Sequence, residues 1–152
     1  MSTGPSLIRG ACLCGRVAFE LEDAAIVAMI GCYCANCRKV SGSQFGVYLQ
    51  VRAAGFRWLA GEGDVATFES SEGNLRGHCR TCGCVAPIPT HYGAVRVPAG
   101  ALDGNPAIAP DVILFEASKA GWCGVDTASR RFDDSGPPDF WRAMVIRLLG
   151  LG

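Results

Sequence analysis

The sequence predicts a mainly β fold that is built from short strands and stabilised by cysteine-bound metal. Three observations lead to this prediction. Segments with strand-like patterns recur with turn signals between them at spacings of about 8–12 residues, which is typical of an all-β fold. The chain of 152 residues contains 20 glycines and 8 prolines, which favour turns over long helices. Eight of its nine cysteines lie in three clusters, within residues 12–14, 32–37 and 79–84.

Composition and length indicate one folded domain. Apolar residues make up 49% of the chain and charged residues 18%, which is ordinary for a globular protein. We see neither an internal repeat nor a linker long enough to divide the chain. We therefore expect a single domain over residues 1–152, with a core at about 7–125 and a C-terminal extension at 126–152.

Charge and hydropathy narrow the partners that we expect. The formal net charge is zero, and lysine and arginine never run beyond pairs, so we expect no nucleic-acid partner. The longest apolar run, Ala24 to Ile30, is too short to cross a bilayer, so we expect no membrane partner. Met1 to Ser6 shows no signal peptide, which favours a cytoplasmic protein with reduced thiols.

The first part of the chain reads as three strands and a turn. Leu7–Ala11 is a short entry strand, and Arg16–Glu22 alternates polar and apolar residues as a half-buried strand does. The apolar run Ala24–Ile30 predicts a buried strand, although a helical turn would also fit. Cys34–Val40 is expected to form a tight turn or one helical turn that ends at Ser41-Gly42.

The middle of the chain predicts further strands. Phe45–Val51 has the composition of a strand, and Phe56–Ala60 alternates again. Val65–Glu69 and Asn74–His78 are expected to pair with each other through the turn Ser70–Gly73.

The last third contains two short strands and one helix. Val95–Val97 and Val112–Phe115 are the strands, and the Pro/Gly/Ala-rich segment Pro98–Pro110 between them is a loop. Pro137–Asp139 is expected to start a closing helix. Apolar residues then recur at helical spacing, which predicts core packing or docking of one helix face. They are Phe140, Trp141, Met144, Val145, Leu148 and Leu149.

Two cysteine pairs predict a closed metal site. Cys79-x-x-Cys82 is followed by glycine, as in a zinc knuckle, and Cys12-x-Cys14 is a tighter pair that is also followed by glycine. A structural zinc takes four ligands in a tetrahedron, and these are often supplied by closely spaced cysteine pairs. Together the two pairs form the first cysteine group, which would join two distant parts of the β core.

The remaining cluster predicts an open metal site. Cys32, Cys34 and Cys37, the second cysteine group, offer three sulfur ligands. Three protein ligands leave one position of a zinc ion for water or substrate, which is typical of a catalytic site. We therefore expect two zinc sites, one structural and one open, and we expect these three cysteines to serve catalysis.

The charge of three thiolates narrows the chemistry. Zinc bound to three thiolates carries a net negative charge, which makes it a poorer Lewis acid than zinc bound to neutral histidines. Such a centre suits a fourth thiolate better than a hydroxide, because zinc accepts sulfur readily. The predicted chemistry is thiol addition to a carbonyl, or the reverse cleavage of a carbon–sulfur bond.

The ordered motifs resemble a known family, that of the glutathione-dependent formaldehyde-activating enzyme, also called the centromere protein V/GFA family. The similarity covers roughly residues 7–125. Its motifs are Gly10–Phe19, Cys32–Ser43, Phe56–Trp58 with Gly61, Ser70–Gly83 and Ser118–Trp122.

The resemblance implies a fold and an activity. The fold would be of the Mss4-like type, mostly antiparallel β with zinc knuckles. The first cysteine group would hold a structural zinc, and the second group a more labile one. The activity would be that of a carbon–sulfur lyase, which forms S-(hydroxymethyl)glutathione from glutathione and formaldehyde. The partners would then be a small-molecule thiol and a small aldehyde.

Three residues depart from the pattern of the family. Tyr33 stands where histidine is frequent, His78 where phenylalanine is usual, and Cys84 where a small hydroxyl residue is usual. These departures concern the substrate more than the metal sites. We expect His78 to be a strand residue beside the knuckle, with an acid/base group or a spare ligand as the alternative. We expect Cys84 to be a small packed residue, with a competing ligand for the structural zinc or a redox thiol as the alternative.

Other residues have two interpretations each. Arg38 and Arg76 suit either recognition of the glutathione carboxylates or a hydrogen bond to a metal-bound thiolate. His91 is expected in a surface turn, and Trp58 and Trp122 in the core. The lone Cys123 is expected to be buried or simply on the surface.

Two other functions stay open at this point. The chain could be a binding or interaction module in which both zincs are structural and Cys84 or a partner completes the second site. The neutral charge argues against a chromatin role for such a module. An iron centre held by four cysteines would also satisfy the clusters.

Overall fold

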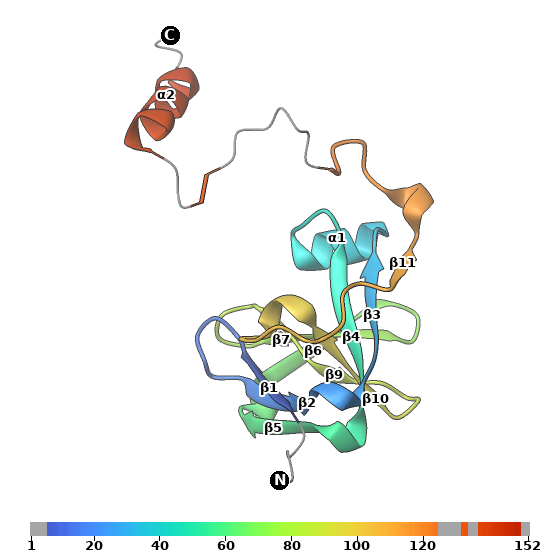
Figure 1. Cartoon of the computed structure of the whole chain (residues 1–152). Coiled ribbons are helices and arrows are strands. Elements are labelled where there is room, and N and C mark those ends of the chain that lie inside the picture. Colours follow the sequence, from blue (N-terminus) through green and yellow to red (C-terminus); the bar gives the residue numbers. More distant parts are fainter. Residues whose placement is uncertain (1–5, 125–131, 134–136, 150–152) are drawn as a thin grey trace.

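Strands dominate the protein, as the sequence predicts, and they form three sheets (Figure 1). The structure is a computed structural model that describes residues 6–124, 132–133 and 137–149. Within the sheets the strands pair antiparallel, except that β11 runs parallel to β3. The predicted mainly β class with a short C-terminal helix is therefore confirmed.

The first sheet has the strand order β1-β2-β5. Its strands are β1 (Leu7–Ala11), β2 (Ala18–Glu22) and β5 (Phe56–Ala60). The predicted bounds of β1 and β5 are confirmed, whereas β2 begins two residues later than predicted. A buried carboxylate on β2 interrupts the polar-out alternation, because Glu20 is only 4% exposed.

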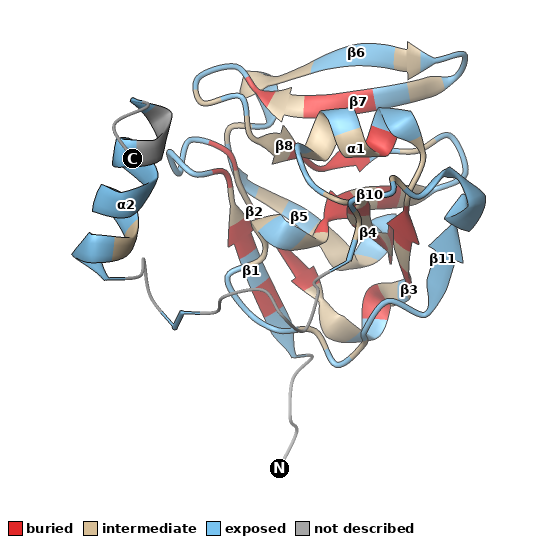
Figure 2. Ribbon diagram, turned by 90° about the horizontal axis from the view of Figure 1, so that it is seen from above, coloured by how far each residue is buried: buried red, intermediate tan, exposed pale blue. Residues whose placement is uncertain are grey.

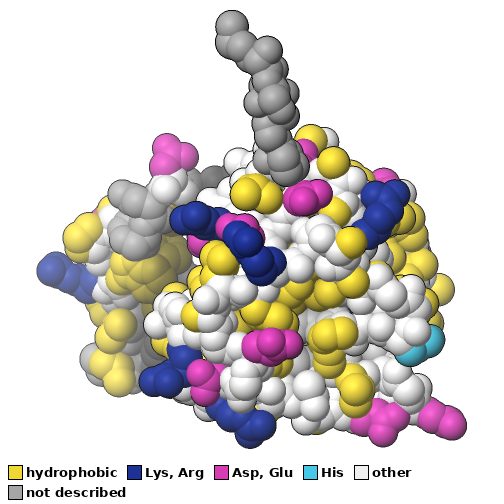
Figure 3. Space-filling model, turned by 90° about the horizontal axis from the view of Figure 1, so that it is seen from below, with side chains coloured by type: hydrophobic (Ala, Val, Ile, Leu, Met, Phe, Trp, Pro, Cys, Tyr) yellow, Lys and Arg dark blue, Asp and Glu magenta, His cyan; other side chains and the backbone are white. Residues whose placement is uncertain are grey.

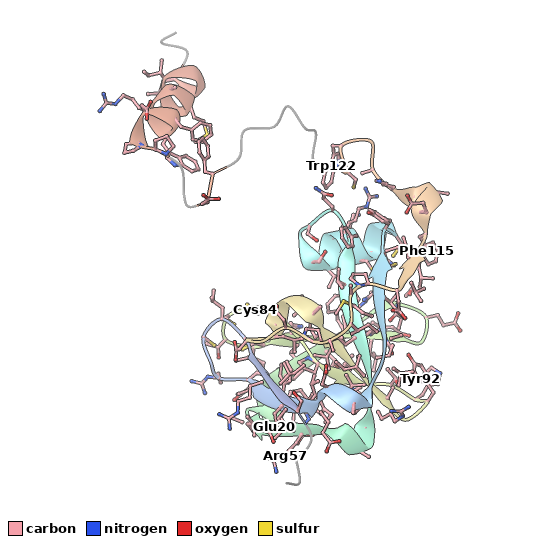
Figure 4. The ribbon with its side chains drawn as sticks, in the orientation of Figure 1. Glu20, Arg57, Cys84, Tyr92, Phe115 and Trp122 are labelled. Atoms are coloured by element: carbon pink, nitrogen blue, oxygen red, sulfur yellow. The ribbon has the colours of Figure 1, made fainter. Side chains whose placement is uncertain are left out.

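Glu20 is buried between two arginines on the neighbouring strands. Arg9 on β1 and Arg57 on β5 are its register partners, and both form ion pairs with its carboxylate (Figure 4 labels Glu20 and Arg57). Arg9 Nε lies 3.7 Å from the Glu20 carboxylate. Cross-strand pairs of opposite charge stabilise a sheet, and here they compensate the burial of the charge.

The second sheet has five strands in the order β11-β3-β4-β10-β9. In chain order they are β3 (Ile26–Cys32), β4 (Gly46–Arg52), β9 (Ile88–Pro89), β10 (Ala94–Pro98) and β11 (Val112–Leu114). The two-residue strand β9 is too short to produce a recognisable pattern in the sequence, and it was not predicted.

The predicted strand Ala24–Ile30 needs a correction. Asp23–Ala25 forms a short 3-10 helix, η1, and the strand starts only at Ile26. The pairing of β3 with β4 shifts register between Ile26 and Ala28. This irregularity leaves Val27 without a partner on β4, and its side chain is 56% exposed rather than buried.

The third sheet contains the predicted hairpin. Its strands are β6 (Val65–Ser71), β7 (Asn74–Cys79) and the short β8 (Val85–Ala86), in that order. β6 and β7 pair antiparallel across a turn in which Gly73 has φ 70°. Such a positive φ favours glycine, and the turn signal in the sequence is confirmed.

Two α-helices complete the described chain. The alternative of a helical turn after Cys34 is confirmed, because α1 spans Ala35–Ser41 and Gly42 ends it with φ 62°. The helix predicted from Pro137–Asp139 is confirmed as α2 (Pro138–Leu148). The expected burial of its apolar stripe is not found, since Trp141, Met144 and Val145 are 45%, 38% and 47% exposed. Docking of this face stays a prediction.

The main core lies between the first and second sheets, and Figure 2 shows its buried residues on the strands of both. β2 and β4 contribute side chains that are fully enclosed, such as Phe19 and Leu49. In the second sheet, the neighbouring strands β3 and β4 continue from this core to Cys32 and Tyr48. The complete set is Ile8, Phe19, Leu21, Ala25, Met29, Leu49, Val51, Val95 and Val97.

Candidate metal centres and the cavity between them

The structure brings together the four sulfur atoms of the first cysteine group, which all lie within 4.8 Å of one another. Cys12 and Cys14 come from the turn after β1, and Cys79 and Cys82 from the end of β7 and the turn after it. The Sγ atom of Cys14 lies 3.5 Å from that of Cys12 and 3.9 Å from that of Cys79. Sulfur ligands at about 2.3 Å from a tetrahedral zinc would lie about 3.8 Å apart, so the group fits this metal.

Glycine makes both turns possible. Gly15 and Gly83 follow the two pairs with φ values of 74° and 73°. Their backbone N–H groups donate to the carbonyls of Cys12 and Cys79, each at 2.9 Å. These bonds close the turns and direct both sulfur pairs to one point, which is the local reason for the glycine after each pair.

Backbone N–H groups also shift the pKa values of thiols in the first group. The backbone N–H of Cys84 lowers the pKa of Cys82 to about 6. The backbone N–H of Arg16 favours ionisation of Cys14, but the neighbouring Cys12 thiol and the other thiols outweigh it and raise the pKa of Cys14 to about 12. One group thus contains both a readily ionised thiol and one that stays protonated until a metal replaces its proton.

The second cysteine group is equally close, with its three sulfur atoms within 4.8 Å of one another. Cys32 is the last residue of β3, Cys34 is the N-cap of α1, and Cys37 lies in the first turn of this helix. The backbone N–H of Cys37 donates to Cys34 Sγ at 3.4 Å. The start of α1 therefore places the second and third sulfur atoms beside the end of β3.

The surroundings of the second group shift the pKa values of its thiols in different directions. Burial raises the pKa of Cys32 to about 12. Burial also opposes ionisation of Cys34, but hydrogen bonds from the backbone N–H of Cys37 and from the neighbouring thiols outweigh it and lower the pKa of Cys34. Both metal groups match the predicted residue sets in space, and both could hold metal ions in a way consistent with zinc.

Arg76 contacts the second group directly. Its guanidinium donates from Nη2 to Cys37 Sγ at 3.4 Å and from Nε to Ser70 Oγ at 3.0 Å. The Arg76 side chain is buried, with 4% exposure, so it does not reach solvent to meet a carboxylate. Of the two interpretations of Arg76, the structure shows the hydrogen bond to a thiol.

Tyr48 on β4 packs against the second group. It is 7% exposed and packs with Cys32 and Cys37 in one buried cluster. The guanidinium carbons of Arg76 and Arg96 lie 5.6 and 5.8 Å from the centre of its ring. Burial raises the pKa of Tyr48, so its hydroxyl stays protonated. Tyr48 and Arg96 were not predicted as site residues, because a tyrosine and an arginine in strands give no local signal in the sequence.

A cavity of about 800 Å³ lies between the two cysteine groups. Cys12 and Cys84 line it on the side of the first group, and Tyr48 lines it toward the second group. A second cavity, of about 550 Å³, shares Val40, Gly83 and Val85 with the first. None of the three cysteines of the second group lines either cavity. Tyr48, which lines the larger one, packs against Cys32 and Cys37.

Cys84 lies beside the first group rather than the second. It packs against the cluster of Cys12 and Cys79, and Figure 4 shows it near the loop between β1 and β2. The idea that Cys84 completes the second site is therefore wrong. His78 is a strand residue beside the knuckle, as expected. It lies on β7 against Phe68, with ring centres 6.1 Å apart, and lines the smaller cavity.

The remaining candidates belong to neither cysteine group. His91 is exposed in a turn, as expected. Trp58 packs against the main core, as expected, and also against the cluster that contains Cys12 and Cys79. Trp122 is 66% exposed and does not join the core. Cys123 is partly exposed, and its thiol lies 3.5 Å from the carbonyl of Gln44.

Comparisons with known proteins give a family and a fold. Residues 7–118 match the family model described as glutathione-dependent formaldehyde-activating enzyme. A crystal structure of a Rhodobacter sphaeroides protein is similar to the chain, with a TM-score of 0.54 and 22% identity. The similarity covers 70% of this chain and 98% of that protein, and it shows the shared fold. No curated protein matches the chain.

Proposed function

Because the chain belongs to the glutathione-dependent formaldehyde-activating enzyme family, we propose that it is a zinc-dependent carbon–sulfur lyase. It acts on an adduct of a thiol and a small aldehyde, such as S-(hydroxymethyl)glutathione formed from glutathione and formaldehyde. The observation that carries this proposal is the contrast between the two cysteine groups. The first offers four sulfur atoms and the second three, with no further histidine, cysteine or carboxylate joining it among the described residues.

The four-sulfur group suits a structural ion, because four protein ligands close a tetrahedral site. The three-sulfur group leaves a position for substrate. Zinc held by Cys32, Cys34 and Cys37 would take up a substrate thiol there and favour its thiolate form.

The side chains around the second group support thiol chemistry. Arg76 donates to Cys37 Sγ and offsets negative charge on the sulfur atoms. The cavity of about 800 Å³ has the size of a small-molecule site, and Tyr48 connects it to Cys32 and Cys37. These residues would hold the organic part of the adduct beside the sulfur atoms and exclude water from them.

We also propose a cytoplasmic location and reduced thiols. All nine cysteines are free in the structure, which agrees with a reducing compartment. No helix among the residues that the structure describes is long and apolar enough to span a bilayer.

An interaction module with two structural metals is the competing function. It would need a partner to complete the second group, because Cys84 lies with the first group. Acidic and basic side chains are interspersed on the face shown in Figure 3, without the single-sign surface that an electrostatically bound partner would use. The charge pattern of this face therefore does not favour an electrostatically bound partner.

Metal analysis combined with turnover tests the proposal. We expect two zinc ions per wild-type chain and one in Cys34→Ser with the fold retained, together with loss of adduct formation from thiol and formaldehyde. Cys123→Ser, which removes a thiol outside both groups, should keep both ions and full activity. A colourless protein excludes the iron alternative. Unchanged turnover in Cys34→Ser would contradict the proposal, and two tightly held ions without turnover would favour the module.

A further inference from the structure

The hydroxyl of Tyr48 is buried and has no hydrogen-bond partner among the described residues. The whole side chain is 7% exposed. A buried polar group without a partner destabilises a fold by about 1–3 kcal/mol, so such groups usually find a partner or serve a function. The hydroxyl shares this property with Arg38 Nε and His78 Nδ1, but those two residues are less buried as a whole.

The ring of Tyr48 is fixed in place. A side chain at Gly46 would bring its Cβ to within 2.7 Å of the ring, so the glycine allows the ring to lie against the backbone. Arg76 and Arg96 lie over the ring, and each is anchored by its own hydrogen bonds. Arg76 donates to Ser70, and Arg96 donates to the side chain of Asn74. The hydroxyl therefore cannot turn toward a partner elsewhere without breaking these contacts.

Tyr48 lies where the substrate of the proposed reaction would be. Its side chain packs with Cys32 and Cys37 and also lines the larger cavity. No other residue of the described chain belongs both to that buried cysteine cluster and to the lining of this cavity. Val85 lines the cavity as well, but it only packs against the cluster from outside and carries no polar group.

We propose that the Tyr48 hydroxyl is the hydrogen-bond donor to the substrate oxygen. In the forward direction the sulfur of the thiol substrate attacks the carbonyl carbon of the aldehyde, a C–S bond forms, and the electron pair of the C=O π bond moves to oxygen. Tyr48 donates to this oxygen while it becomes negative, and solvent supplies the proton that completes the hydroxyl. The thiol loses its own proton to solvent, so atoms and charge balance. In the reverse direction the same donor holds the hydroxyl oxygen of the adduct.

This inference rests on the proposed function and makes a separate claim about one group. A donor that is already oriented stabilises a developing oxyanion more than water does, because it needs no reorganisation.

The substitution Tyr48→Phe removes only this hydroxyl and keeps the ring that packs on Gly46. We expect kcat for adduct formation to fall by about 100-fold or more, the typical effect of losing one oxyanion donor, with little change in KM for the thiol. Zinc content should be unchanged. Tyr92→Phe is the matched control, because it removes the hydroxyl of an exposed tyrosine that donates to Gln50 at 3.1 Å.

Ligand binding gives a second readout that needs no turnover. S-(hydroxymethyl)glutathione, kept intact by excess formaldehyde, and S-ethylglutathione have the same size and differ in one hydroxyl. The wild type should bind the hydroxyl-bearing ligand about tenfold more tightly than the ethyl ligand, and Tyr48→Phe should lose this preference. Equal preference in both proteins would overturn the inference.

The outcomes separate the two proposals. An active wild type with unchanged kcat in Tyr48→Phe overturns the role of Tyr48 and leaves the lyase intact. A variant that loses zinc shows that Tyr48 supports the metal group instead of the substrate. A wild type that forms no adduct with any thiol overturns the proposed function, and the role of Tyr48 falls with it.

Discussion

Individual cysteines of the two groups differ because their neighbours differ. Cys82 meets a backbone N–H in an exposed turn, whereas Cys32 is buried at the end of a strand. Cys37 alone accepts a hydrogen bond from a buried guanidinium, that of Arg76. Residue type therefore makes both groups able to hold a metal ion, and neighbouring groups determine how strongly each thiol ionises.

Replacing Arg76 with glutamine tests the contact with Cys37. Without the cation, negative charge on the sulfur atoms is less stabilised, and we expect zinc affinity of the second group to fall by about 10–100-fold. Competition with a coloured zinc chelator measures this affinity. Arg52→Gln is the control, since Arg52 is exposed and donates to the carbonyl of Ala24. Equal affinities in the two variants would show that the contact with Cys37 has no effect on the metal.

The pKa of Cys82 predicts a pH dependence in the metal-free protein. With a pKa of about 6, Cys82 is a thiolate above pH 6 and becomes protonated below it. Its alkylation by iodoacetamide should be nearly constant between about pH 7 and 8 and fall about tenfold for each pH unit below the pKa. Peptide mass spectrometry measures the rate. Cys84, whose neighbour Cys82 helps raise its pKa, should react slowly throughout. Equal rates at Cys82 and Cys84 would contradict the prediction.

At the scale of elements, α1 and its N-cap place Cys34 and Cys37 of the second cysteine group beside Cys32 at the end of β3. The helix spans the seven residues Ala35–Ser41 between the Cys34 cap and Gly42, whose φ is 62°. A Cβ at Gly42 would meet no atom within 4 Å, so only the backbone conformation requires glycine there.

The substitution Gly42→Ala should therefore destabilise the zinc-loaded protein by about 1–2 kcal/mol through backbone strain. Urea denaturation measures the free energy of unfolding. Gly63→Ala is the matched control, because it also has open space around it but lacks a positive φ, and it should change stability little. Similar losses in both variants would show that the left-handed conformation is not the cause.

Local signals in the sequence predicted most elements and both cysteine groups. Each of these signals lies within a few residues of sequence. They are the cysteine pairs followed by glycine and the helix end at Ser41-Gly42. They can therefore be recognised without a structure. The packing of β4, β7 and β10 brings Tyr48, Arg76 and Arg96 into contact. No short sequence pattern predicts a contact between residues so far apart in the chain. The bulge at Val27 depends in the same way on pairing with a distant strand.

At the scale of the whole molecule, the charge of the larger cavity predicts thiol preference. Asp103 is the one charged residue in its described lining. The carboxylates of glutathione would then remain near solvent, where an ion pair contributes at most about 1 kcal/mol. We expect kcat/KM for neutral 2-mercaptoethanol within about fivefold of that for glutathione.

Steady-state kinetics with both thiols checks this expectation. Asp103→Asn should raise kcat/KM for glutathione modestly and leave that for 2-mercaptoethanol unchanged, because only the first carries net negative charge. A preference of wild type for glutathione above about 100-fold would require cationic contacts that the described cavity lacks.

The first cysteine group spans 65 residues between Cys14 and Cys79. During synthesis at about 5–20 residues per second, the nascent chain exposes Cys12 and Cys14 for roughly 3–13 s before their partners emerge. All three cysteines of the second group leave the ribosome within that interval, because they lie within six residues of one another. A free ion that arrives early therefore meets the three sulfur atoms of the second group together with an unpaired Cys12-x-Cys14. With zinc bound as proposed, the second group would be complete for loading before Cys79 and Cys82 join the first group.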